Sequence, residues 1–202
     1  MVRSGASYGA IIVLALTLTS CLVREPIRGQ EVTGLDEKLS LFAYIEEGDL
    51  VTLIVDTRAA RDRDGFPYMP LEIAIANNGL RQLALTRESF TLRDQEGNRY
   101  PAAGPKELIE GYTYLDFDRN LAELQGIIYN KFAAKARYPS SFSPTGSATR
   151  LVRDLVSLPK HGYLLDFIYF PTPPTGIRGR QFELFMDSPH LPDPVFVKFE
   201  VR

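Results

Sequence analysis

Alternation of apolar and polar residues is the dominant pattern along this chain, and it falls in short segments bounded by turn residues. Successive side chains of a strand point to opposite faces, so a period of two predicts a strand with one buried face. Asn77-Asn78-Gly79 is a typical turn sequence between two such segments. The pattern predicts strands over residues 39–45, 50–56, 71–77, 83–85, 90–93, 163–170, 181–187 and 195–201. Residues 150–158 fit a short helix or a strand, and a strand is favoured because residues 159–162 would join it to 163–170 as a hairpin.

A different period appears in the middle of the chain, between residues 119 and 137. Apolar residues recur there at spacings of three and four, which places them on one face of a helix: Leu121, Leu124, Ile128 and Phe132. Asp118 can cap the start of this helix and Pro139 can end it. Many short strands with one helix predict a mainly β protein, an antiparallel β-sandwich with one inserted α-helix at about 119–137.

The first twenty residues differ from all that follows. Arg3 gives a short positive region, and residues 10–18 form an apolar run that is interrupted only by Thr17. This run is shorter than the roughly 20 residues that span a bilayer, but it fits the apolar region of a secretory signal. Cys21 follows directly and is the only cysteine in the chain, so no disulfide can form within it.

Leu18-Thr19-Ser20-Cys21 resembles the lipobox of bacterial lipoproteins, which is leucine, two small residues and cysteine. The resemblance implies cleavage between Ser20 and Cys21, diacylation of the Cys21 thiol and acylation of the new amino terminus. Such acyl chains would anchor the protein firmly in a membrane. Leu22, where another class of lipoproteins carries aspartate, implies an outer-membrane location facing the periplasm.

These features divide the chain into a signal peptide at 1–20, a lipidated cysteine with a flexible tether at 21–36, and one β-sandwich domain at 37–202 with an insertion at 101–149. Within the domain, residues 71–77, 90–100 and 162–167 carry strand and turn sequences similar to those of the immunoglobulin-like sandwiches of uncharacterised envelope lipoproteins. That resemblance implies an immunoglobulin-like β-sandwich.

Composition and charge exclude several classes of protein. The chain is 45% hydrophobic and 24% charged, which excludes a disordered tail and a collagen-like repeat. Its formal net charge of −2 argues against a nucleic-acid partner, which requires a basic surface. Arg58, Arg61 and Arg63 alternate with aspartates, so their charges are expected to cancel in a solvated loop.

Candidate catalytic and metal-binding groups are few. The sequence has no Gly-x-Ser-x-Gly motif, and its two histidines, His161 and His190, lie in predicted turns. Two histidines without a spare cysteine do not make a zinc site of the usual spacing, so we expect no metal and no cofactor. Asp62-Arg63-Asp64-Gly65 lacks the closing glutamate of a calcium loop and is interpreted as an acidic turn.

Three functional hypotheses remain. The first is a non-enzymatic, lipid-anchored protein that binds or supports an envelope partner through aromatic residues of the insertion: Tyr112, Tyr114, Tyr138 and Phe142. The second is an envelope hydrolase that uses Asp116 and Asp118, which would share one face of a strand. The third is a glycan-binding module that stacks sugars on Tyr112 and Tyr114.

Overall fold

The computed structural model describes residues 30–31, 40–140, 142–144 and 155–202. These residues form a mainly β protein whose strands are β1 (Gln30–Glu31), β2 (Ala43–Glu47), β3 (Val51–Asp56), β4 (Tyr68–Asn77), β5 (Gln82–Leu85), β6 (Phe90–Asp94), β7 (Arg99–Pro101), β8 (Ala136–Arg137), β9 (Val156–Pro159), β10 (Gly162–Pro171), β11 (Gln181–Met186) and β12 (Val195–Glu200). The α-helices are all short: α1 (Arg58–Arg61), α2 (Pro105–Gly111), α3 (Leu115–Asn120) and α4 (Leu124–Ile128). Within the described residues, no helix is long and apolar enough to cross a membrane.

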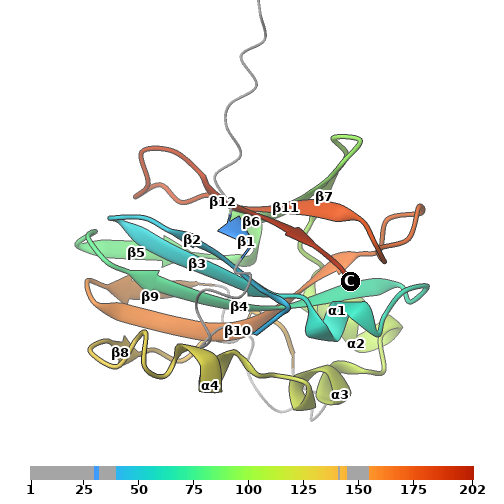
Figure 1. Cartoon of the computed structure of the whole chain (residues 1–202), viewed down its shortest axis with the longest axis horizontal. Coiled ribbons are helices and arrows are strands. Elements are labelled where there is room, and N and C mark those ends of the chain that lie inside the picture. The colour runs from blue at the N-terminus through green and yellow to red at the C-terminus, as the bar shows by residue number, and fades with distance from the viewer. Residues whose placement is uncertain (1–29, 32–39, 141, 145–154) are drawn as a thin grey trace, which may run out of the picture.

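The strands form three sheets. The largest has the order β1-β2-β3-β4-β10-β8 and is antiparallel except for the short contact between β10 and β8. A four-stranded antiparallel sheet has the order β12-β11-β6-β7, and β5 pairs with β9. Figure 1 shows the four-stranded sheet on one side of the large sheet and helices α3 and α4 on the other.

The main core lies between the two larger sheets. Alternate residues of β3 and β4, among them Leu53 and Ile73, are fully buried against the four-stranded sheet, which contributes Leu184, Phe182 and Phe199. This alternation is the pattern that the sequence predicts, and strands form at all eight predicted segments, with boundaries that differ by a few residues.

The opposite face of the large sheet is buried by the segment between β7 and β8. Ile54 and Ala74 point to this face and pack on Leu124, Ile128 and Phe132. Farther along the same face, Phe167 and Tyr169 of β10 pack on Leu108, Tyr112 and Leu115. The large sheet is therefore apolar on both faces, which explains why β10 has apolar residues at nearly every position.

The single helix predicted over residues 119–137 is wrong. Helix α3 ends at Asn120, a turn follows, and α4 extends only to Ile128 with Gly126 inside it, where glycine lowers helix stability. The apolar face was nevertheless identified correctly, because Leu124, Ile128 and Phe132 are only 0%, 1% and 3% exposed. Contact with the sheet at every turn fixes these side chains without a continuous helix.

Candidate functional site

Cys21, Ser20 and Leu22, on which the predicted lipid anchor depends, lie outside the described residues, as does the signal peptide. The described part of the insertion contains the other predicted residues, and it covers one face of the large sheet as α2, α3 and α4 (Figure 1). Three sets of polar contacts hold these short helices on the sheet.

A buried ion pair holds α3 against the loop that follows α1. Two guanidinium nitrogens of Arg63, Nε and Nη2, lie 2.8 and 2.7 Å from Oδ1 of Asp118, and the two side chains are 5% and 0% exposed. The Tyr112 hydroxyl donates a hydrogen bond to Oδ2 of Asp118 at 2.6 Å and accepts one from Nε of Arg63 at 3.1 Å. Burial raises the pKa of Asp118, while hydrogen bonds from Tyr112 and the Arg63 charge oppose the rise.

This pairing corrects two expectations from the sequence. Arg63 is not part of a solvated, self-paired loop, since its partner Asp118 lies 55 residues away. Asp116 and Asp118 do not share a strand face, because they lie two residues apart on helix α3, where such positions do not face each other. Asp118 is buried in the ion pair and Asp116 is exposed, so they do not form the carboxylate pair of a hydrolase.

Three aromatic rings surround the guanidinium of Arg63 and reach the surface. The Arg63 Cζ atom lies 5.4 Å from the ring centroid of Phe66, 4.8 Å from that of Tyr114 and 5.0 Å from that of Phe117. Phe66 and Tyr114 also meet edge to face with centroids 5.0 Å apart. Tyr114 is 39% and Phe117 55% exposed, while Phe66 is half-buried. We refer to Phe66, Tyr114 and Phe117 as the aromatic collar.

Of the four aromatic residues predicted to form a partner surface, only Tyr114 is both exposed and part of the aromatic collar. Tyr112 is 4% and Phe142 0% exposed, so neither can meet a partner in this structure. Tyr112 is buried because its ring packs on Tyr68 and Tyr169, with centroids 5.7 and 5.6 Å away. Tyr138 is half-buried against the main core. The exposed platform of Tyr112 and Tyr114 that the glycan hypothesis requires is therefore absent.

A second set of polar contacts holds the other side of α3. Arg119 donates a hydrogen bond to the Ser143 carbonyl at 3.1 Å and lies 3.7 Å from the Asp166 carboxylate. The backbone N–H of Phe142 donates to Oδ2 of Asp166 at 2.8 Å, which explains why Phe142 is turned inward onto Phe90. Burial raises the pKa of Asp166, and the Phe142 N–H and Arg119 oppose the rise.

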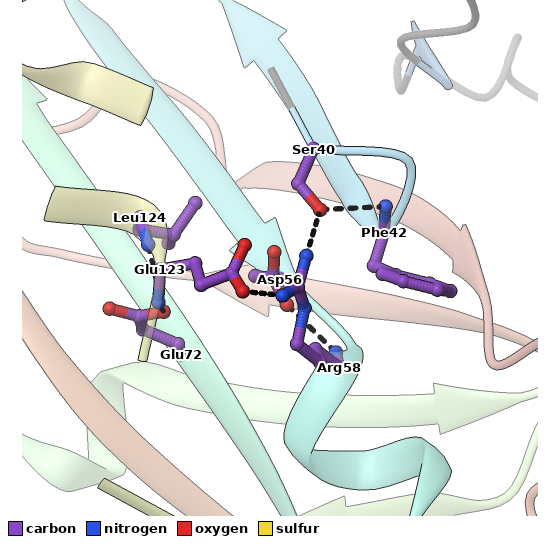
Figure 2. A network of polar contacts seen from close by, with 7 residues as sticks. All are labelled: Ser40, Phe42, Asp56, Arg58, Glu72, Glu123 and Leu124. Atoms are coloured by element: carbon purple, nitrogen blue, oxygen red, sulfur yellow. Dashed lines mark hydrogen bonds and ion pairs between the residues drawn. The ribbon is translucent and has the colours of Figure 1, made fainter. Parts of the chain in front are cut away.

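A third network attaches α4 to the sheet (Figure 2). Glu72 of β4 accepts hydrogen bonds from the backbone N–H groups of Glu123 and Leu124, at 2.9 and 3.1 Å, and so caps the start of this helix. Burial raises the pKa of Glu72 from 4.5 to about 8; the Leu124 hydrogen bond opposes the rise and the Asp56 carboxylate adds to it. Glu72 is therefore largely protonated at neutral pH.

Asp56 lies directly across from Glu72 in the pairing of β3 with β4, and both side chains are buried. Asp56 accepts the backbone N–H of Arg58 at 2.7 Å, while the Arg58 side chain forms an ion pair with Glu123 and donates to Ser40 (Figure 2). Burial raises the pKa of Asp56, and the Arg58 N–H opposes the rise. Asp56 therefore fixes the start of α1 beside the sheet, and Glu72 attaches the start of α4 to the same place.

Metal-binding groups are dispersed over the described residues, which contain no group of three or more His, Cys, Asp or Glu side chains able to hold a metal ion. His161 occupies the turn between β9 and β10 with a positive φ of 63°. Asp64 of the predicted acidic turn accepts the backbone N–H of Ile177 at 3.0 Å, so this turn fastens a loop.

Two residues of the collar were missed as site residues from the sequence. Phe66 is a single aromatic residue in a polar loop, and Phe117 is one of several aromatic residues in the inserted segment. The sequence around each residue does not mark it as a site residue, because the rings come together only through the contact of Arg63 with α3 in the folded protein. The closely spaced arginines and aspartates at 58–64 gave no indication that Arg63 would pair with a carboxylate far away in the sequence.

Fold and site together define a class of protein: mainly β, with a layer of short helices fixed by buried charges to one face of a sheet. No known protein family matches the sequence, and no curated protein matches it. Among solved structures, a Bacillus subtilis protein provisionally described as a lipoprotein (ycdA) is similar, with 10% sequence identity and a TM-score of 0.37. The match covers 87% of this chain and 39% of that chain, so this chain spans less than half of the Bacillus protein. A similarity at this level carries no functional argument.

Proposed function

We propose that this chain is a lipid-anchored protein of the cell envelope that binds an envelope protein and performs no catalysis. The anchor is supported by Leu18-Thr19-Ser20-Cys21 after an apolar run, and the outer membrane is supported by Leu22. The finer fold assignment, an immunoglobulin-like sandwich, is supported by the positions of β4, β6 and β10 in two stacked antiparallel sheets.

The observation that carries the binding proposal is the aromatic collar. Tyr, Phe and Arg are enriched where proteins bind each other, since large rigid rings bury area with little loss of conformational freedom. Arg63 is already fixed by Asp118, so the rings around it are held in place before any partner arrives. An exposed aromatic group on a rigid support suits the apolar part of a protein partner.

The other two hypotheses receive less support. A hydrolase would require Asp116 and Asp118 in one cleft, whereas only Asp118 is buried, and its carboxylate is occupied by Arg63 and Tyr112. A glycan platform at Tyr112 would require an exposed ring, and that ring is 4% exposed. Binding through Tyr114 and Phe117 therefore remains the proposal for the helical layer.

Site-specific photocrosslinking tests this proposal in cells that make the protein. A photoreactive phenylalanine analogue replaces Phe117, and in a matched control strain it replaces Tyr129, which is 74% exposed on the same helical layer but lies outside the collar. Because the collar is the proposed contact, we expect one discrete crosslinked protein from position 117 and little or none from position 129.

The Asp118→Asn variant provides the second arm. Loss of the charge leaves Arg63 without its carboxylate partner and should loosen the collar, so the crosslink from position 117 should weaken strongly. Equal crosslinking from positions 117 and 129, or none from either, would contradict the proposal.

A further inference from the structure

The outer face of the four-stranded sheet carries a groove that is separate from the aromatic collar. It has a volume of about 820 Å³, within the range of roughly 300–1,000 Å³ that is common for ligand sites. We refer to it as the outer groove; its lining includes Arg93, Arg99, Glu183, Phe185, Phe196 and Lys198. Those on β6, β11 and β12 alternate with side chains of the main core, so they point away from it, and Arg99 of β7 lies beside Arg93.

Two phenylalanine rings form the apolar part of the groove. Phe185 and Phe196 lie directly opposite each other on β11 and β12, and their rings stack with centroids 5.1 Å apart and an angle of 27°. The Arg93 guanidinium lies 4.8 Å from the Phe185 centroid. Both rings are only half-buried although the core side of the same strands is fully buried. Half-buried aromatic rings in a groove offer flat surfaces for a ligand with apolar faces.

A row of charges crosses the sheet beside these rings. The pairing of the strands places Lys198, Glu183, Arg93 and Arg99 side by side on β12, β11, β6 and β7. Arg93 donates from Nε to Glu183 at 2.6 Å and also forms an ion pair with it through Nη2. That pair is neutral by itself, and within the described residues neither Arg99 nor Lys198 has a carboxylate partner.

Two further carboxylates line the groove, but Asp94 accepts hydrogen bonds from Asn98 and Tyr100, and Glu96 pairs with Arg180. The outer groove therefore presents two cations without carboxylate partners at its ends, with the stacked Phe185 and Phe196 rings beside the row of charges. Three strand spacings of roughly 4.8 Å separate Lys198 from Arg99, so the two cations are anchored roughly 14 Å apart. The Arg93–Glu183 pair between them can both donate and accept hydrogen bonds. A ligand that fits needs apolar flat faces, many hydroxyl groups and negative charges that are spaced along its length.

We propose that the outer groove binds an acidic saccharide chain, with sugar rings on Phe185 and Phe196 and acidic groups on Arg99 and Lys198. A neutral saccharide would leave the two cations without partners, and an apolar peptide would leave the remaining donors and acceptors of the Arg93–Glu183 pair without a hydrogen bond to the ligand. This site does not depend on the collar, since the collar lies on the helical layer at the opposite face of the large sheet.

Calorimetric titration of the purified full-length protein in detergent tests the proposal. The acidic probes are a hyaluronan hexasaccharide, which carries carboxylates, and a phosphomannan oligosaccharide, which carries phosphates; the neutral probe is chitohexaose. We expect at least one acidic probe to bind about tenfold or more tightly than chitohexaose, with affinity that falls as salt is raised. The acidic probe that binds also distinguishes a carboxylate ligand from a phosphate ligand.

Two variants locate the binding. Phe196→Ala and Lys198→Gln should each lower the affinity for the acidic probe roughly tenfold, and Lys198→Gln leaves the core untouched, so its fold is not at risk. The matched control Phe117→Ala should bind the probe as the wild type does, whatever it does to protein crosslinking. The proposal is overturned if no acidic probe binds, if chitohexaose binds equally well, or if Lys198→Gln has no effect. It is also overturned if Phe196→Ala converts a dimer to a monomer, because the groove would then be a contact between two copies.

Discussion

Glu72 makes the stability of this protein depend on pH in a direction that can be calculated. In the folded protein its pKa is about 8, whereas an unfolded chain has the ordinary value of 4.5. Between these two pH values the folded state retains a proton that the unfolded state has released. The free energy of unfolding must therefore fall as the pH rises from about 4.5 to about 8, by up to about 1.4 kcal/mol per pH unit for one proton.

The variant Glu72→Gln isolates this effect. A glutamine oxygen can still accept the N–H groups of the α4 start, but it does not ionise. Three other buried carboxyl groups also have raised pKa values, those of Asp56, Asp118 and Asp166, and they lower the stability of variant and wild type alike as the pH rises. The informative quantity is therefore the difference in free energy of unfolding between variant and wild type.

Urea unfolding at several pH values measures that difference. As the pH rises from about 5.5 to about 7.5, the free energy of unfolding of Glu72→Gln should increase relative to that of the wild type by up to about 2.7 kcal/mol. Well above pH 8 this difference should stop growing. A difference that stays constant over this range would refute the reasoning, because Glu72 would then ionise equally in both states.

Two further predictions concern the helical layer, and urea unfolding measures both. Phe132→Ala removes a ring that is 3% exposed and should lower the free energy of unfolding by about 3–5 kcal/mol, whereas Tyr129→Ala should lower it by less than about 0.5 kcal/mol. Equal effects would show that the helical layer is not docked on the sheet as described. Tyr112→Ala should cost about 3 kcal/mol or more, since it removes a buried ring and a hydrogen bond to Asp118, whereas Tyr114→Ala should cost less than about 1 kcal/mol. Tolerance of Tyr112→Ala would contradict the buried network.

The strands could be predicted from the sequence because their signal is local. Residues 195–201 alternate between core and outward positions, and residues 71–77 alternate between large apolar side chains and Glu or Ala, so both patterns are visible without any knowledge of the partner strands. The inserted segment was predicted less well. Its buried positions follow helical spacing, but the breaks between α3 and α4 are set by contacts with Glu72 and the sheet, which lie far away in sequence.

The candidate site depended even more on distant contacts. Arg63 has aspartates on both sides, and nothing nearby indicates that it pairs with Asp118 and orders the aromatic collar. The same holds for the outer groove, where Arg93, Glu183 and Lys198 come from three strands that meet only in the folded sheet. Aromatic content in the sequence indicated that binding was plausible, but the distribution of exposed rings required the structure.

The claim that most constrains this account is the lipid anchor, since it decides which partners the collar can meet. Mass spectrometry of the N-terminal peptide of the protein from isolated membranes tests it directly, with a Cys21→Ser strain as control. The account predicts a peptide that begins at Cys21 and carries acyl chains, in the outer-membrane fraction, and an uncleaved, unacylated precursor in the Cys21→Ser strain. An unmodified Cys21 thiol, or a mature chain that begins elsewhere, would contradict it.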